Sequence, residues 1–457
     1  MLSIGQTIEV EITDLNHAGQ GVARVDNFVV FINGAVKGDI AEIIITEKKK
    51  NFAVGKLLKI IKSSKNRIQP PCRYFNWCGG CQLMHIDYKE QLNYKKSRVV
   101  NELKKAKVNI ADTRIYDTVG MERPFRYRNK NTFSVTEKNG EICIGPYEQY
   151  SYNTVDIDRC IIQSREADKA AQLFKNLMLK YNVQSYNKNT GKGIVRNIVI
   201  RSTKNDQLMF IIVTVSKEFK NKNMLVKDFV LKDSNIKTVI QNINSKGTNL
   251  VMGRKNIVLY GRGVISDSIG DLNFTISTNT FFQVNHIQTE KLYQKAVEYA
   301  DIKKDDICFD IYCGIGTISL MAAKYAEKVY GVEIAEQSVV NARKNAVDNN
   351  VGNAEFYSGK AEQIVPMLYK QNIKANVVIL DPPRKGCEKK VIQTIISMSP
   401  ERIVYVSCNP STLSRDIKLL ESGGYILKQV QPLDMFPWSV HVECVILMQR
   451  SGLEDEK

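Results

Sequence analysis

The N-terminal part of the chain alternates between apolar and polar positions. Residues 8–12 and, more loosely, residues 27–32 repeat with the period of two that a half-buried β-strand shows. Glycines separate these runs at positions 19, 21, 34 and 38, as turns require. Several short strands within such a short length are typical of a small barrel. We therefore predict an all-β barrel over residues 1–62.

The rest of the chain divides into a mixed region and a regular one. Residues 63–265 combine strand-like and helical pieces, and we expect the helical part at about residues 98–119 to pack on the domain that follows. From residue 266 to residue 457, buried strands alternate with helices. This alternation predicts a mainly parallel sheet with helices on both faces. The fold class is α/β: a barrel, a central α+β domain over 63–265 and a Rossmann-like domain over 266–457.

The net charge of the chain indicates the class of its binding partner. The chain carries 65 Lys and Arg against 48 Asp and Glu, a formal net charge of +17. Such a balance favours a polyanionic partner, and nucleic acid is the commonest one, although a merely solubilising surface remains the alternative. The end of the barrel is basic and contains no acidic residue. We expect this surface to contact successive phosphates of a nucleic-acid backbone. Its cations are Lys48, Lys49, Lys50, Lys56, Lys59, Lys62, Lys65 and Arg67.

The apolar runs exclude a membrane protein. None approaches the roughly 20 residues that a membrane span needs, and no secretory signal precedes the first strand. We therefore expect a cytoplasmic protein without a membrane partner. In a reducing compartment the ten cysteines favour catalysis or metal binding over disulfides.

A ligand-binding turn follows the strand that ends at Asp310. Gly314 and Gly316 lie at the switch from this strand to a helix, where doubly wound sheets bind ligands. Glu333 ends the next strand, where a carboxylate can accept ribose hydroxyls, but position 319 is Ser rather than the third Gly of a dinucleotide fingerprint. Asp310 suits the cationic S-adenosylmethionine instead. A Rossmann-type turn without this cofactor remains the alternative.

Two further strands end in candidate catalytic groups. Asp381 begins the run Asp-Pro-Pro-Arg, whose prolines stiffen the loop at the same sheet edge. Cys408 follows another strand, and the turn after it exposes a thiol that could act as a nucleophile. Glu443 is a charged residue inside an apolar strand predicted over 440–448, which marks a candidate base. The alternatives are a rigid surface turn, a buried cysteine and an edge-strand carboxylate.

These motifs together resemble the RNA (uracil-5-)-methyltransferase family, in the order and over the length of the last third of the chain. The resemblance implies a class I methyltransferase domain, Cys408 as the nucleophile and Glu443 as the base that removes a proton. It also places Asp381 near the uracil and implies donor contacts from Gln283, Tyr312, Glu333 and Asp381, beside the Asp310 and Gly314 inferred from the turn. The residues that carry it are 281–285, 310–317, 331–333, 381–386, 407–410 and 441–443.

A second group of cysteines lies within the central domain, mostly near its start. Cys72, Cys78 and Cys81 are spaced to ligate zinc or an iron–sulfur cluster, and the spacing does not choose between these metals. The motif resembles that of family members that hold a [4Fe–4S] cluster, which implies Cys160 as the fourth ligand. Cys143 is the weaker candidate.

The barrel and one central motif also have counterparts in the family. Glycine-containing runs at 19–23 and 34–39 resemble the OB-like, RNA-binding TRAM domain. The segment Arg123–Lys130 mixes cations with rings, as RNA-binding surfaces do, and its last four residues match a family motif. We therefore expect the central domain over 63–265 to bind RNA. A strand with a solvated face is the alternative for this segment.

The barrel and the cysteine group together favour the branch of the family that acts on 23S ribosomal RNA. We therefore expect S-adenosylmethionine-dependent methylation of uracil C5 in 23S rRNA through a covalent Cys408–C6 adduct, by a monomer. A tRNA substrate is the alternative within the family. Cytosine-5 or N-methylation and a non-catalytic ribosome-assembly factor are the alternatives outside it.

Overall fold

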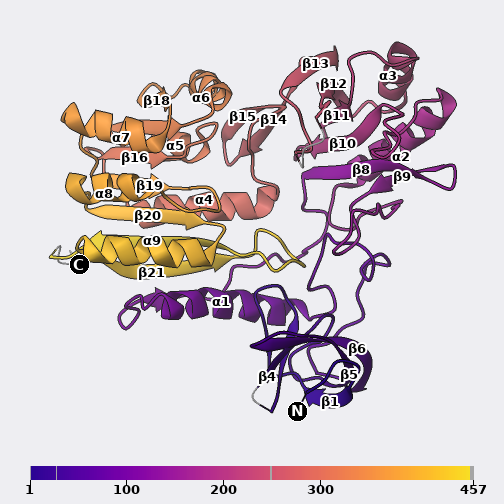
Figure 1. Cartoon of the computed structure of the whole chain (residues 1–457). Coiled ribbons are helices and arrows are strands. Elements are labelled where there is room, and N and C mark those ends of the chain that lie inside the picture. The colour runs from indigo at the N-terminus through magenta and orange to yellow at the C-terminus, as the bar shows by residue number, and fades with distance from the viewer. Residues whose placement is uncertain (1, 27, 247–249, 453–457) are drawn as a thin grey trace.

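The computed structural model describes residues 2–26, 28–246 and 250–452. Asn27, at the start of a predicted strand, lies outside these residues, as do the last five residues of the predicted C-terminal domain. Three sheets of six or more strands organise the chain into a small N-terminal body, a central body and a large C-terminal body (Figure 1).

The N-terminal body is a six-stranded sheet in the order β1-β5-β6-β4-β3-β2. Alternate residues of its strands, such as Val30, Ile32 and Ile43, are buried in one apolar core. Arg67 does not join the expected phosphate-binding surface, because its guanidinium pairs with the buried Asp39 at 2.6 Å. The strands are β1 (Thr7–Glu11), β2 (Asp14–Leu15), β3 (Gly21–Val25), β4 (Phe28–Ile32), β5 (Ile40–Lys48) and β6 (Phe52–Lys62).

The central body is a second six-stranded sheet, in the order β13-β12-β11-β10-β8-β9. Helices α2 and α3 cover one face, and the hairpin β14–β15 covers β11 and β12 on the other. The elements are α2 (Arg165–Lys180), α3 (Lys222–Lys232), β8 (Lys130–Lys138), β9 (Glu141–Gly145), β10 (Val195–Ser202), β11 (Leu208–Thr214), β12 (Ile236–Ile243), β13 (Lys255–Tyr260), β14 (Val264–Ile269) and β15 (Leu272–Ser277).

The C-terminal body is an eight-stranded sheet in the order β18-β17-β16-β19-β20-β22-β21-β7. The five strands from β18 to β20 are parallel, and β22 runs antiparallel between β20 and β21. An apolar core lies on each face. The strands are β16 (Ile307–Ile311), β17 (Lys328–Glu333), β18 (Ala354–Ser358), β19 (Val377–Leu380), β20 (Arg402–Ser407), β21 (Tyr425–Leu433) and β22 (Glu443–Arg450).

Helices cover this sheet, and part of the chain before the central body joins it. Helix α1 (Tyr88–Lys105) packs against α9, and β7 (Arg114–Ile115) extends the sheet edge beside β21. Figure 1 shows α1 between the barrel and the large sheet. The other helices are α4 (His286–Ala300), α5 (Thr317–Ala322), α6 (Glu336–Asp348), α7 (Ala361–Lys370), α8 (Lys389–Met398) and α9 (Pro410–Ser422).

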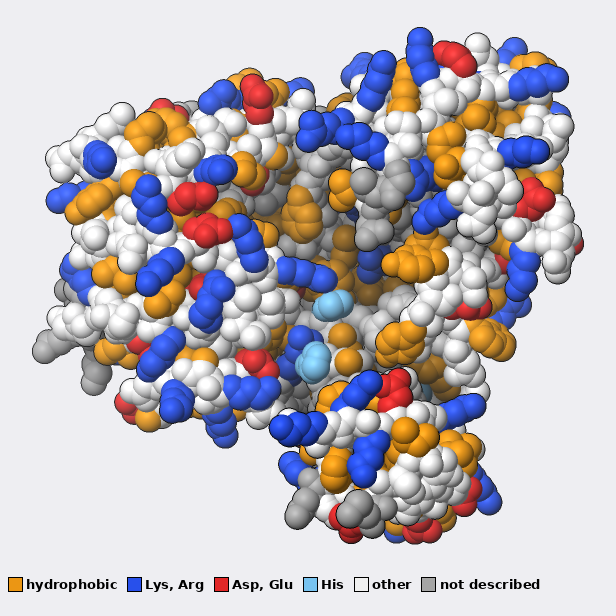
Figure 2. All heavy atoms as spheres, viewed as in Figure 1, with side chains coloured by type: hydrophobic (Ala, Val, Ile, Leu, Met, Phe, Trp, Pro, Cys, Tyr) orange, Lys and Arg blue, Asp and Glu red, His pale blue; other side chains and the backbone are white. Residues whose placement is uncertain are grey.

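The three bodies surround a hollow. Figure 2 shows this hollow opening between them, with Lys and Arg side chains around much of its rim and fewer acidic ones. The excess of cations over this face agrees with the net charge of +17. Among the described helices, none combines the length and apolar character that crossing a membrane requires.

Candidate active site

The candidate catalytic residues meet at one edge of the large sheet. Asp310 lies in β16, and Asp381 and Cys408 follow β19 and β20, so that the carboxyl ends of three parallel strands bring them together. Glu443 begins β22, which pairs with β20. The strand predicted over 440–448 therefore starts three residues later than expected, and the preceding residues form a loop.

Cys408 is half-buried at this edge. Its pKa is raised to about 11, first by burial and then by the Glu443 and Asp381 carboxylates, while the Arg384 guanidinium acts in the opposite direction. The next residue, Asn409, caps α9 and also donates from Nδ2 to the Arg384 carbonyl at 2.9 Å. The cysteine loop and the Asp-Pro-Pro-Arg loop are thereby tied together, with the thiol between acids and one cation.

Glu443 is 3% exposed, so it is not the solvent-facing strand residue that was the alternative. Burial and the neighbouring Asp381 raise the pKa of Glu443 well above its usual range, and Arg384 partly offsets this. A carboxylate that binds a proton so tightly is a strong base once it has lost that proton. The position beside Cys408 and the raised pKa both suit a group that removes a proton from a bound substrate.

Three carboxylates lie along the neighbouring strands. Burial raises the pKa of Asp310 to about 7, and burial with the Asp310 charge raises that of Asp381 to about 7. Glu333 adds to the negative potential around Asp310. None of the three forms an ion pair with another residue in the described part of the chain. A cationic ligand would supply the missing positive charge.

Asp310 itself leaves a hydrogen-bonding atom free. The Ser319 hydroxyl donates to its Oδ2 at 2.5 Å, whereas the buried Oδ1 has no partner among the described residues. A buried acceptor without a donor is costly. S-adenosylmethionine carries two positively charged groups, a sulfonium and an ammonium. Its charge matches the acidic surroundings, and its ammonium group can donate a hydrogen bond to the free Oδ1 of Asp310.

The loop after β16 has the backbone geometry of a close ligand contact. Tyr312 has a φ of 74°, which is unusual for a residue with a side chain, and Gly314 has a φ of 57°. Gly314 donates its N–H to Glu333 Oε2 at 3.2 Å, and a Cβ at Gly314 would meet open space. The loop therefore leaves room beside Glu333 where a ligand can approach the backbone.

Gln283 lies at the joint between the central and C-terminal bodies. It is 4% exposed, and its carbonyl accepts a hydrogen bond from Asn129 Nδ2 at 2.9 Å. Its side chain interacts with the hydroxyl of Tyr293, which Thr317 also contacts. Gln283 is thus placed beside the helix that follows the Gly314 loop, although its sequence motif alone indicated no chemistry.

The segment Arg123–Lys130 differs from the sequence prediction. Tyr127 is 2% exposed and its hydroxyl donates to the Pro437 carbonyl at 2.9 Å, so its ring is unavailable for stacking on RNA. Phe125 stacks on Trp438 with ring centroids 5.2 Å apart. The rings of this segment therefore hold the central body against the loop that precedes Glu443.

The second cysteine group gathers near the same joint. Cys72, Cys81 and Cys160 pack against one apolar cluster that includes Tyr127 and Trp438. The pKa of Cys81 is raised by burial and then by Cys160, Cys78 and Cys72, and all four thiols are free. Within the described ranges, no group of three or more His, Cys, Asp or Glu is arranged to hold a metal ion. Cys143 lies elsewhere, beside Asp156.

Sequence reasoning missed several supporting residues. Lys95 of α1 is fully buried and forms an ion pair with the equally buried Asp434, and it donates to the Phe436 carbonyl at 3.0 Å. This pair holds the segment that leads to Glu443. Nothing in the local sequence connects positions so far apart. The Ser319–Asp310 hydrogen bond lies within one strand–turn–helix unit, but the sequence alone did not indicate it. Arg384 was visible as part of a motif, but its effect on Cys408 required the structure.

Comparison with known proteins agrees with this arrangement. Residues 87–451 match the model of the tRNA (Uracil-5-)-methyltransferase family, and residues 2–58 match the TRAM domain. An uncharacterized RNA methyltransferase of Clostridium tetani is 45% identical over 98% of this chain and 97% of its own. One of Halalkalibacterium halodurans is 41% identical over 97% of this chain and 96% of its own.

A solved structure extends the match to the whole architecture. The crystal structure of the Pyrococcus abyssi tRNA (uracil-54, C5)-methyltransferase in complex with S-adenosyl-L-homocysteine is 26% identical, with a TM-score of 0.77. The alignment covers 96% of this chain and 100% of the archaeal one. The family model and the full-length relatives bear out the resemblance seen in the sequence motifs: the chain belongs to the S-adenosylmethionine-dependent RNA (uracil-5-)-methyltransferase family and carries an N-terminal TRAM domain.

Proposed function

We propose that this enzyme methylates uracil C5 through a covalent adduct on Cys408. The thiolate adds to C6 of the uracil, and the resulting enolate carbon C5 attacks the methyl group of S-adenosylmethionine, which leaves as S-adenosylhomocysteine. The Glu443 carboxylate then takes the proton from C5, the C6–S bond breaks and the thiolate is released. The base must leave its stack to reach a nucleophile at this depth.

One observation carries this proposal: a thiol, two carboxylates and a cation converge at the sheet edge that also holds the donor site. Glu443, Asp381 and Arg384 each act on the charge of Cys408, and Asp381 and Arg384 also act on that of Glu443. Arg384 favours the thiolate and is available to the charge that develops on the uracil oxygen O4. N-methylation needs no thiol, so this grouping favours C5 chemistry.

The test uses RNA substituted with 5-fluorouridine, because fluorine at C5 cannot be removed as a proton. With S-adenosylmethionine, the wild type should form an RNA–protein adduct that survives denaturation, and Cys408→Ala should form none. Cys143→Ala, which alters a cysteine of the central body, is the matched control and should form the adduct normally. Methyl transfer by Cys408→Ala would contradict the thiol mechanism and favour N-methylation.

For the substrate we propose 23S ribosomal RNA, on the combination of the barrel with the cysteine group. A tRNA is the second candidate, because an archaeal tRNA enzyme aligns with 96% of this chain, including the barrel region. The two are separated by incubating the enzyme with labelled donor and an equimolar mixture of unmodified 23S rRNA fragments and tRNA transcripts. Label in 23S rRNA supports the first candidate, and label in tRNA alone overturns it.

We further propose that Cys72, Cys78, Cys81 and Cys160 bind a [4Fe–4S] cluster. The donor set fits, since all four thiols are free, three of them pack against one apolar cluster, and Cys78 lies near enough to Cys81 to raise its pKa. A four-iron cluster also separates its ligand sulfurs further than a single ion does, which is compatible with the lack of a single-ion arrangement among the described residues. The cluster would join the chain before α1 to the central body. Anaerobically purified protein should contain iron and sulfide, and stoichiometric zinc without iron would refute this assignment.

A further inference from the structure

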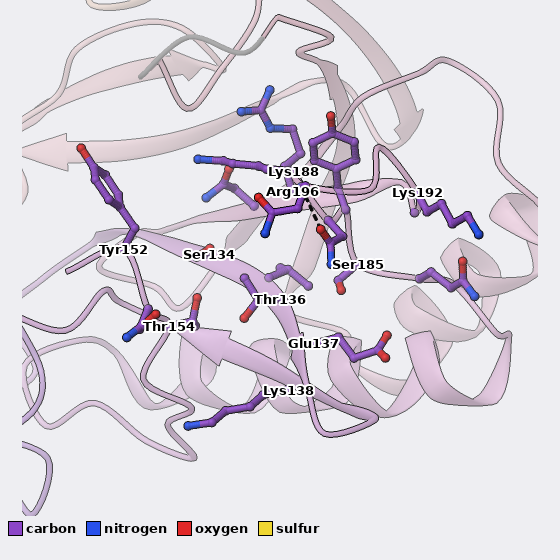
Figure 3. A pocket seen from close by; sticks show the side chains of 18 of the residues that line it. Ser134, Thr136, Glu137, Lys138, Tyr152, Thr154, Ser185, Lys188, Lys192 and Arg196 are labelled. Carbon is purple, nitrogen blue, oxygen red and sulfur yellow. Dashed lines mark hydrogen bonds between the residues drawn. The ribbon is translucent and has the colours of Figure 1, made fainter.

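A cavity of about 950 Å³ opens on the central body, away from Cys408. The loop after β9 and the loop before β10 form its walls, and the strands β8 and β10 form its floor (Figure 3). Figure 3 shows Lys188 reaching toward Tyr152 across the hollow, whereas Lys192 points away from it. Nothing in the proposed methyl transfer uses this cavity.

The lining of the cavity carries rings and cations in the combination that single-stranded nucleic acids bind. Tyr152 is 77% exposed and lies edge-to-face with Tyr147 at 5.8 Å between centroids. Lys188 Nζ lies 5.8 Å from the Tyr152 ring, and Arg196 lies 5.7 Å from the Tyr186 ring. Bases stack on such rings while cations contact the phosphates. An exposed ring with cations around it therefore favours a nucleotide over an apolar ligand.

The floor of the cavity belongs to the sheet face that α2 and α3 leave uncovered. Along β8, Phe133 and Val135 face the helices, so Thr132, Ser134 and Thr136 face the opposite side. The hairpin β14–β15 packs mainly on β11 and β12 on this side. A polar strip therefore runs from the cavity along β8 toward Lys130, over a length of about 20 Å.

Two cations without counter-charges stand at the end of this strip. Lys130 on β8 lies directly opposite Arg201 on β10, and like charges in this position repel. Neither forms an ion pair with a described residue, and Arg201 is 4% exposed with its Nε unpartnered. Burial and the adjacent Arg201 lower the pKa of Lys130 to about 8. An anion is the group that would satisfy this pair.

Arg201 also connects this end of the strip to the active site. Its Nη2 donates to the Thr280 carbonyl at 2.5 Å, and Thr280 lies in the loop that continues to Gln283. Lys130 directly follows Asn129, which holds the Gln283 carbonyl. The cation pair is therefore anchored to the segment beside the donor site, and the strip leads from there to the cavity.

We propose that the polar strip along β8, together with the cavity at its end, is a binding track for a single-stranded RNA segment adjacent to the target uridine. A backbone phosphate binds between Lys130 and Arg201, and a base farther along the strand stacks on Tyr152 beside Lys188. The track rests on the proposed function for its direction, because the target uridine lies at its Cys408 end. It adds a substrate-binding site outside the catalytic centre.

The direct test measures binding of fluorescein-labelled oligouridylate U20 by anisotropy at several salt concentrations. The double variant Tyr152→Ala/Lys188→Ala should bind at least tenfold more weakly, and its salt dependence should fall by about one phosphate contact. Lys227→Ala is the matched control, because it removes an exposed lysine from α3 on the opposite face of the same body. Equal affinity for U20 in the double variant and the wild type would overturn the track.

A second measurement separates the track from the catalytic proposal. Fluorouridine-substituted RNAs with long and with minimal flanks are compared for adduct formation at saturating concentration. The double variant should form the adduct with the minimal RNA at the wild-type rate, and loss on both RNAs would show a general defect that contradicts the track. If the wild type forms no adduct with any RNA, the proposed function fails, while the U20 titration still decides the track.

Discussion

Cys408 and Cys81 lie in two different environments, and beyond burial the pKa of each thiol is raised by different neighbours. Cys408 is the single thiol of its site, and its neighbours are charged side chains. After burial, its pKa is raised most by the Glu443 and Asp381 carboxylates. Cys81 is half-buried and packs against apolar side chains, and after burial its pKa is raised most by other thiols. A raised pKa therefore does not identify the role of a thiol, whereas the charges of its neighbours do.

The two environments require different changes to produce thiolate. At Cys408 the opposing charges are carboxylates, so protonation of Glu443 or a bound cationic donor beside Asp381 favours the thiolate. At the four-cysteine group the opposing groups are other thiols, and only a shared cation can stabilise several thiolates at once. Under the proposed function, the first environment would serve a single reversible bond and the second a permanent metal ligation.

Of the substitutions that test this difference, removal of the proposed base Glu443 should have the largest effect. In Glu443→Gln, addition and methylation can proceed but the C5 proton has no acceptor, so the methylated RNA should remain attached to the enzyme. We expect turnover to fall about 10³-fold and labelled adduct to accumulate on ordinary uridine RNA in a denaturing gel. Rapid turnover by this variant would show that another group removes the proton.

The pH dependence of alkylation tests the electrostatic account of Cys408. Because its pKa is raised to about 11, the reactive thiolate fraction should increase about tenfold per unit between pH 7 and pH 9. Asp381→Asn removes a negative charge, lowers the pKa of the thiol and should raise its alkylation rate severalfold at pH 9. The rates are measured on the Cys408 peptide with iodoacetamide, and a plateau below pH 8 would contradict the account.

A substitution in the four-cysteine group should affect iron content and stability rather than adduct formation at Cys408. Cys160→Ser should reduce bound iron and lower the melting temperature by several degrees, since a bound cluster stabilises the folded state. Adduct formation at Cys408 should persist, because no catalytic step involves this group. Cys143→Ser, also in the central body, serves as the control for iron content and melting. Unchanged iron in Cys160→Ser would exclude Cys160 as a ligand.

The smallest expected effect concerns the stability of the donor site. The pKa of Asp310 is raised from 3.8 to about 7 in the folded protein, so the folded state binds this proton more tightly than the unfolded state. Ionisation therefore destabilises the fold progressively between about pH 4 and pH 7. Asp310→Asn should raise the melting temperature by a few degrees at pH 8 and by nothing at pH 4. It should also abolish the stabilisation that S-adenosylmethionine confers on the wild type.

Local pattern was sufficient for part of this picture. Alternating buried strands and helices predict the parallel sheet, and the shared carboxyl edge of parallel strands predicts that Asp310, Asp381 and Cys408 come together. The strand alternation also predicts the barrel. These inferences succeed because they depend on chain periodicity and on one topological rule.

The remaining features depend on contacts between distant segments. The sequence around Tyr127 resembles an RNA-binding surface, but packing against the loop at Pro437 buries its ring. Glu443 starts its strand later than the apolar run indicates, and the Lys95–Asp434 pair that supports it joins residues of α1 to that loop. The apolar pattern of one segment does not indicate which side chains of a distant segment will contact it.

The central claim is that one of the ten cysteines is the nucleophile. It is tested most directly by digesting the fluorouridine adduct and locating the attached nucleotide by mass spectrometry. The account predicts that the nucleotide is found only on the peptide that contains Cys408, at up to one per chain. A nucleotide on any of Cys72, Cys78, Cys81 or Cys160, or methyl transfer to C5 with no attached nucleotide, would contradict it.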